Sequence, residues 1–474
     1  MMVSNWDEIT DVLVIGSGFA GLAAAIEAHN NGSSVIILEK MNAPGGNSII
    51  SDGGIAAAGT EMQEKLAIKD SPELMYQDML KAGLSINYPD LVRQVTEKSS
   101  EVVQWSIDYL GVEYLDRLDI FGGHSVPRCL TPVGVSGATI IKRQLEKLNE
   151  MKIKVRTGAF FRTFVSDSEG KTTGVIIGEG YSHKDAGSGT EKHIGIRRGI
   201  VLATGGFGSD VNFRSTQDPR LTKDIATTNK PFATAEALKE ALKINAMPVQ
   251  LSHIQLGPWG TPDEKGYGAG AHFSEYIVFP YGIVVEPNSG KRIVDELADR
   301  KTISDAILGV GYPCIGIADE SAVETTGWDI KPSLEKGIVK QFGHLHELAS
   351  HYGISSDEFE LTVERYNGYV SDGVDREFGK QILSNAAPIA TPPYYGIRTW
   401  PKVHHTMGGV QINTRAQVID INQQPIERIY AAGEVTGGIH GACRLGSCAI
   451  TECLVFGRIA GRNASQETIC RVTE

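Results

Sequence analysis

The sequence predicts an α/β protein with a Rossmann-like unit, in which parallel strands alternate with helices. Residues 11–40 contain an apolar strand, a glycine loop, a helix of small residues and a second apolar strand. Two further apolar strands, within Gly199–Asp210 and Ile429–Ala449, each run into a glycine-rich turn. The chain has 474 residues, which is enough for two or three domains.

Composition and charge exclude several classes of protein. The formal net charge is −12 at pH 7 and there is no basic block, so binding to nucleic acid is not expected. No apolar run approaches the ~18 residues of a membrane span. The first residues lack a basic stretch followed by an apolar one, so we expect a cytoplasmic protein. A periplasmic protein whose signal peptide, haem domain or FMN domain had been removed would look the same.

The first glycine loop predicts a site for the pyrophosphate of a dinucleotide. Strand Val12–Ile15 leads into Gly16-Ser17-Gly18-Phe19-Ala20-Gly21, and a second strand, Val35–Leu38, is followed by Glu39 and Lys40. In this motif the first glycine permits a tight turn and the second lets the pyrophosphate approach the backbone. The third glycine lets helix and strand pack closely, and the helix N-terminus supplies amide donors. The acid at the end of the second strand is placed to accept hydrogen bonds from a ribose.

Additional glycine-rich segments favour FAD over NAD as the dinucleotide. Residues 42–59 read NAPGGNSIISDGGIAAAG, a composition that can lay backbone amides along an extended cofactor. The strand ends within 199–210 and 429–449 bring two more glycine turns, and Glu434 in the second is placed to accept from a ribityl chain. Three separate glycine-rich strand ends that return to one site suit the length of FAD.

These residues give the sequence a resemblance to the flavoprotein family of fumarate reductases and succinate dehydrogenases. It is most similar to the soluble flavocytochrome c branch, which includes reductases of other 2-enoates such as urocanate. The resemblance extends from about residue 10 to about residue 463. Its most specific pieces are GKRIVDELADRKTISDAI at 290–307, HHTMGGV at 404–410 and AAGEVTGGIHGACRLG at 431–446.

The resemblance implies a Rossmann-like FAD-binding domain with an inserted α+β capping domain. The FAD-binding domain is expected at residues 1–250 and 406–474, and a mobile cap at residues 251–405. The lack of a second glycine loop of the first kind in residues 251–345 agrees with an insertion. Within the cap, residues 355–373 predict an amphipathic helix with Leu361, Val363 and Tyr366 on its inner face.

No haem motif and no covalent flavin-attachment domain are evident in the sequence, so we expect non-covalently bound FAD and a separate electron donor, which would be a cytochrome, a reductase or reduced flavin. Ala235 and Ala237 flank Glu236 at a place where relatives have glycines. Beyond the first glycine loop with Glu39 and Lys40, the residues expected to contact FAD are Gly46, Asn47, Ser48, Gly53, Gly54, Thr204, Gly205, Glu236, Glu434, Arg444, Ala449 and Ile450.

Arg300 is the arginine that the resemblance assigns as the catalytic acid. In the family a hydride passes from the flavin to one alkene carbon, and an arginine protonates the other carbon. A carbon that has become carbanion-like is basic enough to take a proton from a guanidinium. Glu275 matches the acid that relays protons to this arginine. Taken alone, Arg300 could instead be a surface arginine paired with one of three nearby acids, which are Asp295, Glu296 and Asp299.

The adjacent pair His404 and His405 raises the question of what two neighbouring imidazoles do. By resemblance, His405 and Arg444 hold one carboxylate of the substrate, for which a guanidinium fork and an imidazole donor are well suited. His404 is expected to pack or to bond to the backbone. A metal pair is not expected, because neighbouring residues on a regular strand point to opposite faces and no further ligands lie nearby.

The sequence departs from fumarate reductases where the second carboxylate would bind. Gly257 stands where those enzymes have a histidine, and Trp259 follows it. Ser274 keeps a hydroxyl of the family's Thr-Glu segment, while Val278 stands near the place of a relay arginine. A second carboxylate without its donor would be underpaired, at a cost of several kcal/mol. The aromatic residues of this region are Trp259, Tyr267, Tyr276, Phe279 and Tyr281.

We therefore expect a reductase of a mono-carboxylate 2-enoate, such as urocanate, a cinnamate-type acid or an acrylate-type acid. Three alternatives stay open from the sequence. The chain could reduce fumarate, it could be a dehydrogenase of the 3-ketosteroid type, or it could bind FAD without turnover as a sensor or interaction module. The Arg300, His405 and Arg444 set argues against the last two.

Overall fold

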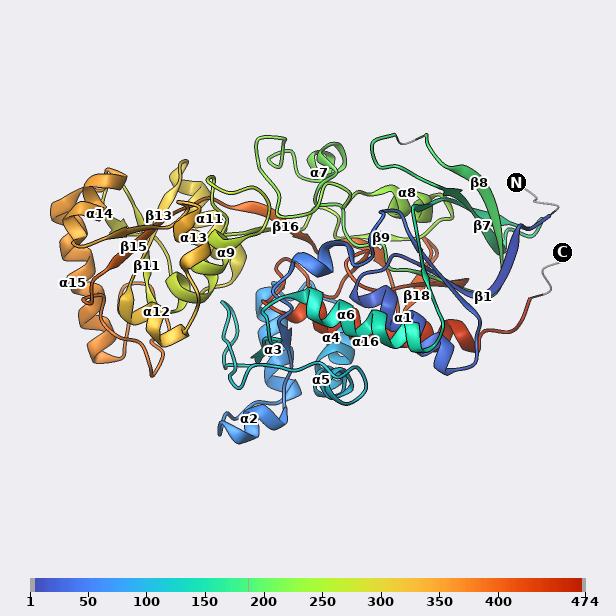
Figure 1. Cartoon of the computed structure of the whole chain (residues 1–474), viewed down its shortest axis with the longest axis horizontal. Coiled ribbons are helices and arrows are strands. Elements are labelled where there is room, and N and C mark those ends of the chain that lie inside the picture. Colours follow the sequence, from blue (N-terminus) through green and yellow to red (C-terminus); the bar gives the residue numbers. More distant parts are fainter. Residues whose placement is uncertain (1–4, 186, 471–474) are drawn as a thin grey trace.

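The computed structural model describes residues 5–185 and 187–470, which form two bodies (Figure 1). The larger body contains an eight-stranded sheet, and the smaller body contains a five-stranded sheet. Strand β16, Lys402–Thr406, runs between them and pairs antiparallel with β10, Ile254–Gly257. In the part of the chain that the structure describes, no helix is both long and apolar enough to cross a bilayer.

The eight-stranded sheet confirms the predicted α/β class. Its main path has the order β18-β19-β8-β1-β2-β5, in which β19, β8, β1, β2 and β5 run parallel. Off this path, β7 pairs with β8, and β6 pairs with β7. Gly16 follows β1 with φ +109°, and a Cβ there would lie 2.1 Å from the carbonyl oxygen of Ala203. Only glycine fits this turn. The strands are β1 Glu8–Ile15, β2 Val35–Glu39, β5 Val155–Thr157, β6 Ala159–Ser166, β7 Thr172–Glu179, β8 Thr190–Leu202, β18 Gln417–Ile419 and β19 Pro425–Ala431.

Helices cover this sheet, and short strand pairs join the loops around it. The short strands are β3 Ile55–Ala56, β4 Cys129–Leu130, β9 Pro248–Val249, β17 Gly409–Gln411 and β20 Thr436–Gly437. The helices are α1 Phe19–Asn30, a 3-10 turn Gly46–Ile50, α2 Glu61–Lys65, α3 Pro72–Ala82, α4 Pro89–Glu97, α5 Ser99–Asp108, α6 Gly137–Glu150, α7 Val211–Gln217, α8 Glu236–Lys243 and α16 Cys448–Gln466.

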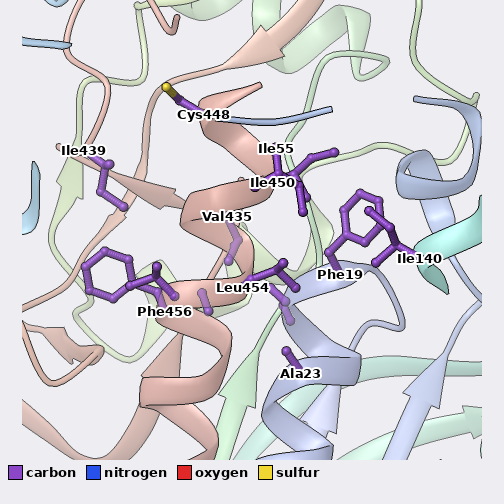
Figure 2. Close-up of a cluster of buried hydrophobic side chains, with 14 of the residues drawn as sticks. Phe19, Ala23, Ile55, Ile140, Val435, Ile439, Cys448, Ile450, Leu454 and Phe456 are labelled. Carbon is purple, nitrogen blue, oxygen red and sulfur yellow. The ribbon is translucent and has the colours of Figure 1, made fainter. Parts of the chain in front are cut away.

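Two helices from opposite ends of the chain, α1 and α16, form the centre of the larger core. Figure 2 shows Ala23 of α1 close to Leu454 of α16, with Phe19 and Ile450 further along the same contact. A Cβ on Gly461 would lie 2.0 Å from the carbonyl oxygen of Ala24, so glycine allows the two backbones to approach closely. This packing fixes the start of α1 and the turn before α16 relative to each other.

The smaller body is an α+β unit inserted between β9 and β17, as the fold class predicted. Its sheet has the order β12-β11-β13-β15-β14, with antiparallel neighbours. Its exact boundaries at 250 and 405 and its mobility stay predictions. The elements are β11 Ile283–Glu286, β12 Lys291–Arg292, β13 Cys314–Asp319, β14 Lys340–Phe342, β15 Tyr394–Thr399, α9 Ala269–Phe273, a π-helical turn Ser274–Val278, α10 Phe279–Tyr281, α11 Arg300–Val310, α12 Glu320–Thr326, α13 Lys331–Glu335, α14 Leu345–Tyr352 and α15 Ser356–Asp372.

Helix α15 confirms the predicted amphipathic helix but corrects one residue of its inner face. Val363 and Tyr366 are buried together with Phe359 and Val370, whereas Leu361 is 49% exposed. The buried residues recur at intervals of three or four, which is one face of a helix. Leu361 lies two positions from Phe359 and therefore points away from that face.

A buried ionic cluster braces the strand and turn that lead to Arg300. Arg292 Nη2 lies 2.8 Å from Glu296 Oε2 and 3.0 Å from Asp375 Oδ2, and all three side chains are fully buried. Lys380 Nζ lies 3.4 Å from the same Glu296 oxygen. Glu296 Oε1 also accepts a hydrogen bond of 3.0 Å from the backbone N–H of Val284, so the cluster ties the segment to β11.

Replacing Arg292 with Met should therefore destabilise the smaller body. Removal of one member of a buried ionic cluster leaves the remaining charges uncompensated, and this costs about 3–5 kcal/mol. Denaturant unfolding of the variant measures the loss. Arg365→Met is the matched control, because Arg365 forms an exposed pair with Glu358 in the same body and should cost less than about 1 kcal/mol. Equal effects of the two substitutions would contradict the assignment.

Candidate active site

Two connected cavities extend from the glycine loops to the junction of the two bodies. The first is lined by the glycine loop that follows β1, and the second is lined by Arg300, His405 and Arg444. They share Phe19, Asn47, Ser48, Glu434 and Cys453, so they form one elongated space. An elongated cavity lined by a glycine loop, a helix N-terminus and two acids fits a dinucleotide such as FAD.

Most of the residues predicted to contact FAD line these cavities. Gly21 and Gly53 line neither, and a Cβ on Gly21 would lie 2.0 Å from the carbonyl oxygen of Gly16, so Gly21 serves helix–strand packing. Those in the first cavity are Gly16, Ser17, Gly18, Ala20, Glu39, Lys40, Gly46, Asn47, Ser48, Thr204, Gly205, Glu236 and Glu434. Those in the second are Asn47, Ser48, Gly54, Glu434, Arg444, Ala449 and Ile450.

Two acids stand at the ends of parallel strands in the first cavity. Glu39, at the end of β2, is buried and accepts hydrogen bonds from Ser17 Oγ at 2.5 Å and from the N–H of Met41 at 2.9 Å. Glu434, after β19, accepts from the N–H of Thr406 at 2.9 Å. Both carboxylates are held in place by donors of the protein, and both line the cavity as acceptors for hydroxyl groups. Glu236 pairs with Lys40, whose Nζ lies 3.2 Å away.

The arginine predicted to be the acid lies inside the second cavity. Arg300 is the first residue of α11 and is 7% exposed. Its Nη2 donates to Glu275 Oε1, while its Nη1 has no hydrogen-bond partner in the described chain. The interpretation of Arg300 as a surface arginine paired with Asp295, Glu296 or Asp299 is therefore wrong. The guanidinium lies 5.6 Å from the centre of the Trp259 ring, a cation–π distance.

Arg300 and Glu275 form a closely coupled buried ion pair. Burial lowers the pKa of Arg300, but the neighbouring Glu275 carboxylate outweighs it and raises the pKa above its ordinary value. Burial raises the pKa of Glu275 above its ordinary value, although the charge of Arg300 opposes this rise. Arg300 is therefore a protonated group whose one free side faces the cavity.

Arg444 is a buried cation without an acidic partner. It is 4% exposed, its Nη1 donates to the carbonyl oxygen of Leu445 at 2.8 Å, and its Nε has no partner. No ion pair joins it to an acid within residues 5–185 and 187–470. Burial, followed by the charge of Arg300, lowers the pKa of Arg444 to about 10. A buried guanidinium of this kind favours the binding of an anion in the cavity.

His405 lies in the same cavity as Arg444 and is neutral. Burial lowers its pKa well below the ordinary value, and the charge of Arg444 lowers it further. His405 Nδ1 lies 3.6 Å from Glu434 Oε1. A neutral imidazole beside a carboxylate can still donate one N–H to a bound anion. His405 and Arg444 thus offer donors to one anion from two segments far apart in sequence.

The neighbouring His404 lines the same cavity as His405. The expectation that these two neighbours on a strand point to opposite faces is therefore wrong. In the pairing of β10 with β16, Gln255 is opposite His405 and Leu256 is opposite Val403, so His404 is the extra residue of a β-bulge. A bulge interrupts the alternation of faces. His404 Nδ1 lies 2.9 Å from Thr228 Oγ1, and its ring packs against Trp259, so its hydrogen-bond partner is a side chain. No group of three or more possible metal ligands occurs among the described residues.

Gly257 and Trp259 together explain the departure from the fumarate reductase pattern. A Cβ on Gly257 would lie 2.5 Å from Cη2 of the Trp259 indole, so the indole occupies the space in front of residue 257. Trp259 is 1% exposed and lines the cavity, whereas Gly257 and Ser274 do not line it. Of the other aromatic residues expected there, Tyr267 lines the cavity, and Tyr276, Phe279 and Tyr281 lie outside its lining.

Sequence reasoning missed Asp52 as a residue of this cavity. Asp52 Oδ2 accepts a hydrogen bond of 2.9 Å from the hydroxyl of Tyr276, and Oδ1 accepts one of 3.0 Å from the N–H of Gly54. Asp52 is the only charged residue of the segment 42–59. The sequence signal for a role of Asp52 in the cavity was its position as a single acid in a run of small and apolar residues after the first glycine loop.

Comparisons with known proteins find similarity over nearly the whole chain. A family described as an FAD binding domain matches residues 11–450. An acrylate reductase flavoprotein subunit of Shewanella woodyi is 41% identical over 465 residues, which cover 97% of this chain and 92% of that protein. A urocanate reductase of Eggerthella lenta is 36% identical over 475 residues, which cover 96% of this chain and 74% of that protein. The open conformation of a flavocytochrome c3 fumarate reductase matches with a TM-score of 0.76 at 33% identity, covering 98% of this chain and 79% of that one.

Replacing Glu39 with Ala should weaken FAD binding. The variant loses a charged acceptor in the cavity. Ser17 Oγ and the N–H of Met41 then lose the carboxylate to which they donate hydrogen bonds. Hydrogen bonds to charged groups contribute about 1.5–3 kcal/mol, which corresponds to roughly 10–100-fold in the dissociation constant. Flavin fluorescence titration of the apoprotein measures the change. Glu427→Ala, which removes an exposed acid that pairs with Lys171, is the control, and equal FAD affinity in both variants would contradict the role of Glu39.

Proposed function

The chain belongs to the FAD-binding family of flavoproteins that includes acrylate, urocanate and fumarate reductases, and we propose that it reduces a mono-carboxylate 2-enoate. It is an FAD-dependent oxidoreductase that acts on the carbon–carbon bond of an enoate. The family resemblance and the cofactor were both predicted from the motifs at 16–21, 404–410 and 431–446, and both are confirmed. The choice of enoate, the non-covalent attachment of FAD and the roles of individual residues are part of the proposal.

The observation that carries the proposal is the pair of free guanidinium donors in one cavity. Arg444 Nε and Arg300 Nη1 are buried, have no partner in the described chain and belong to residues that line the second cavity. Among the residues that the structure describes, Arg444 lacks an acidic partner, whereas Arg300 has Glu275. This asymmetry supports two different roles: Arg444 compensates the charge of a bound carboxylate, and Arg300 faces the carbon that accepts a proton.

The mechanism assigns a separate task to each of these residues. Arg444 and the neutral His405 fix the carboxylate and draw electron density toward it, which makes the double bond a better hydride acceptor. FAD, when bound and reduced, supplies the hydride. Arg300 then gives one N–H proton to the other carbon of the double bond, which becomes strongly basic when the first carbon accepts the hydride. The buried Glu275 carboxylate keeps Arg300 protonated between turnovers and orients its free N–H toward the cavity.

Two features favour a mono-carboxylate over a dicarboxylate such as fumarate. The Trp259 indole fills the space in front of Gly257, so a histidine at position 257 cannot offer a donor to a second carboxylate there. The carboxylate of Asp52 lines the same cavity and would repel a second negative charge. An underpaired or repelled carboxylate in a buried site costs several kcal/mol. Urocanate, cinnamate-type and acrylate-type acids avoid this cost.

The electron donor is proposed to be a separate molecule, as the sequence predicted. A related acrylate reductase is named as a flavoprotein subunit, which supports a division of labour between proteins. A cytochrome, a reductase and reduced flavin stay the candidate donors, and a cytoplasmic location stays a prediction.

A panel of enoates reduced by the holoenzyme with a viologen donor tests this function. We expect the best mono-carboxylate among acrylate, urocanate and cinnamate to exceed fumarate in kcat/KM by at least about 10–100-fold, the equivalent of an underpaired buried charge. Arg444→Met should lower kcat/KM for every acid in the panel, because it removes the anion partner. Fumarate as the best substrate would contradict the proposal.

Exchange of the two residues that close off the second carboxylate position provides a sharper test. The double variant Gly257→His with Trp259→Ala removes the indole and places a donor in its space. The ratio of kcat/KM for fumarate to that for the best mono-carboxylate should rise about tenfold or more. Trp259→Ala alone is the control for the lost volume, and Gly257→His alone should impair all substrates by collision with the indole. An equal ratio in the double variant and in Trp259→Ala would count against this account.

A further inference from the structure

The proposed acid must regain a proton after each turnover, and this requirement rests on the proposed function. Arg300 is buried, and Glu275 is the one acid that it contacts within the described chain. Each reduced molecule of enoate removes one proton from the Arg300 guanidinium. A proton from solvent therefore has to reach Glu275, which is itself 4% exposed.

Glu275 lines the second cavity, which a bound enoate would fill, and apolar side chains close much of its other surroundings. Ile277 and Val278, which follow it in the π-helical turn, are fully buried. A small cavity beside Glu275 and Arg300 is lined mainly by apolar groups. Water needs two to four polar partners to stay in such a space, so this cavity is a poor route for a proton. Its apolar lining side chains include Ile120, Phe121, Pro258, Phe279, Leu297 and Ile303.

Apart from Arg300, Tyr267 is the polar side chain that contacts Glu275 among the residues that the structure describes. Its hydroxyl donates a hydrogen bond of 3.4 Å to Glu275 Oε2, the oxygen that Arg300 does not use. Tyr267 is half-buried and belongs to the loop 258–268, in which Pro262 and Lys265 are exposed. The residue therefore lies between the buried acid and solvent.

The loop is anchored firmly enough to hold the Tyr267 hydroxyl in place. Lys402 is 3% exposed, and its Nζ donates to the carbonyl oxygen of Gly266 at 3.1 Å and also to that of Glu264. The Tyr267 ring packs edge-to-face with Trp259 and with His272, both at 5.0 Å between ring centres. A fixed hydroxyl can serve as a relay, whereas a freely rotating one would lose its contact with Glu275.

We propose that Tyr267 is the residue through which protons from solvent reach Glu275 and then Arg300. In the reloading step the Tyr267 O–H bond breaks and a proton moves to Glu275 Oε2, while a water molecule returns a proton to the phenol oxygen. Rotation of the protonated Glu275 carboxyl then turns this proton toward Arg300, and its transfer to the neutral side chain restores the guanidinium and leaves Glu275 as a carboxylate. The net change is one proton from water to Arg300, and no electrons move. Tyr267 acts through Glu275, so it positions and relays a proton without contact with the reacting carbon.

The electrostatics of Tyr267 fit a transient relay. Burial, together with the nearby carboxylates of Asp52 and Glu275, holds the pKa of Tyr267 well above its ordinary value. The phenolate form of Tyr267 is therefore not expected to accumulate. The phenol oxygen receives one proton as it releases another.

Comparison of the first turnover with steady-state turnover in Tyr267→Phe tests the relay. In the first turnover Arg300 already carries its proton, so reoxidation of the photoreduced holoenzyme by the best mono-carboxylate should proceed at the wild-type rate. Steady-state turnover requires reloading and should fall by about 10–100-fold, the usual contribution of a positioned proton donor, with a larger solvent deuterium isotope effect. Tyr281→Phe is the matched control, because Tyr281 lies in the same body and contacts Asn385 outside the cavity lining.

Two other outcomes would reject the relay through Tyr267, and a further one would reject Arg300 as the acid. Equal slowing of the first turnover and of the steady state would assign Tyr267 a structural role and reject the relay. Unchanged steady-state turnover and isotope effect would also reject it. Arg300→Gln separates this result from a failure of the proposed function, because a fast first turnover in that variant would show that Arg300 is not the acid. Flavin absorbance and thermal unfolding of each variant establish that it is folded and loaded.

Discussion

The site depends on one electrostatic constraint, which is a buried guanidinium without an acidic partner. Arg444 is 4% exposed, and its pKa is lowered to about 10 because burial disfavours its charge. A buried charge without compensation costs several kcal/mol, so the fold retains this arginine at a cost in stability. An anionic substrate removes that cost when it binds. Arg300 differs because Glu275 already compensates its charge, which leaves its free N–H available to give a proton.

The fold satisfies this constraint by bringing together segments that are far apart in the sequence. Packing of α16 against α1 fixes the turn that carries Arg444, and β16 carries His405 from the junction of the two bodies (Figures 1 and 2). The Arg292 cluster braces the segment that leads to Arg300, and the π-helical turn places Glu275 beside it. The proposed carboxylate clamp and the proposed proton donor thus come from different structural units, so their relative position would control the proposed reaction.

The sequence predicted the parts of this arrangement that local pattern determines. The strand–loop–helix–strand unit at 11–40, the acids Glu39 and Glu434, and the grouping of Arg300, His405 and Arg444 all follow from motifs with fixed spacing. The orientation of His404 could not be predicted, because a β-bulge depends on the register with β10 rather than on the residues of β16. Asp52 enters the cavity through tertiary packing of an irregular loop, for which the sequence contains no periodic signal. Leu361 lies on the outer face of α15, because two positions from the buried Phe359 correspond to about half a helical turn.

A crystal structure of the oxidised holoenzyme with a saturated mono-carboxylate such as propanoate would test the central claim most directly. We expect the carboxylate to accept hydrogen bonds from Arg444 and His405. Arg300 Nη1 should face the carbon that is bonded to the carboxylate. A carboxylate bound elsewhere in the cavity, or an Arg300 side chain turned away from that carbon, would contradict it.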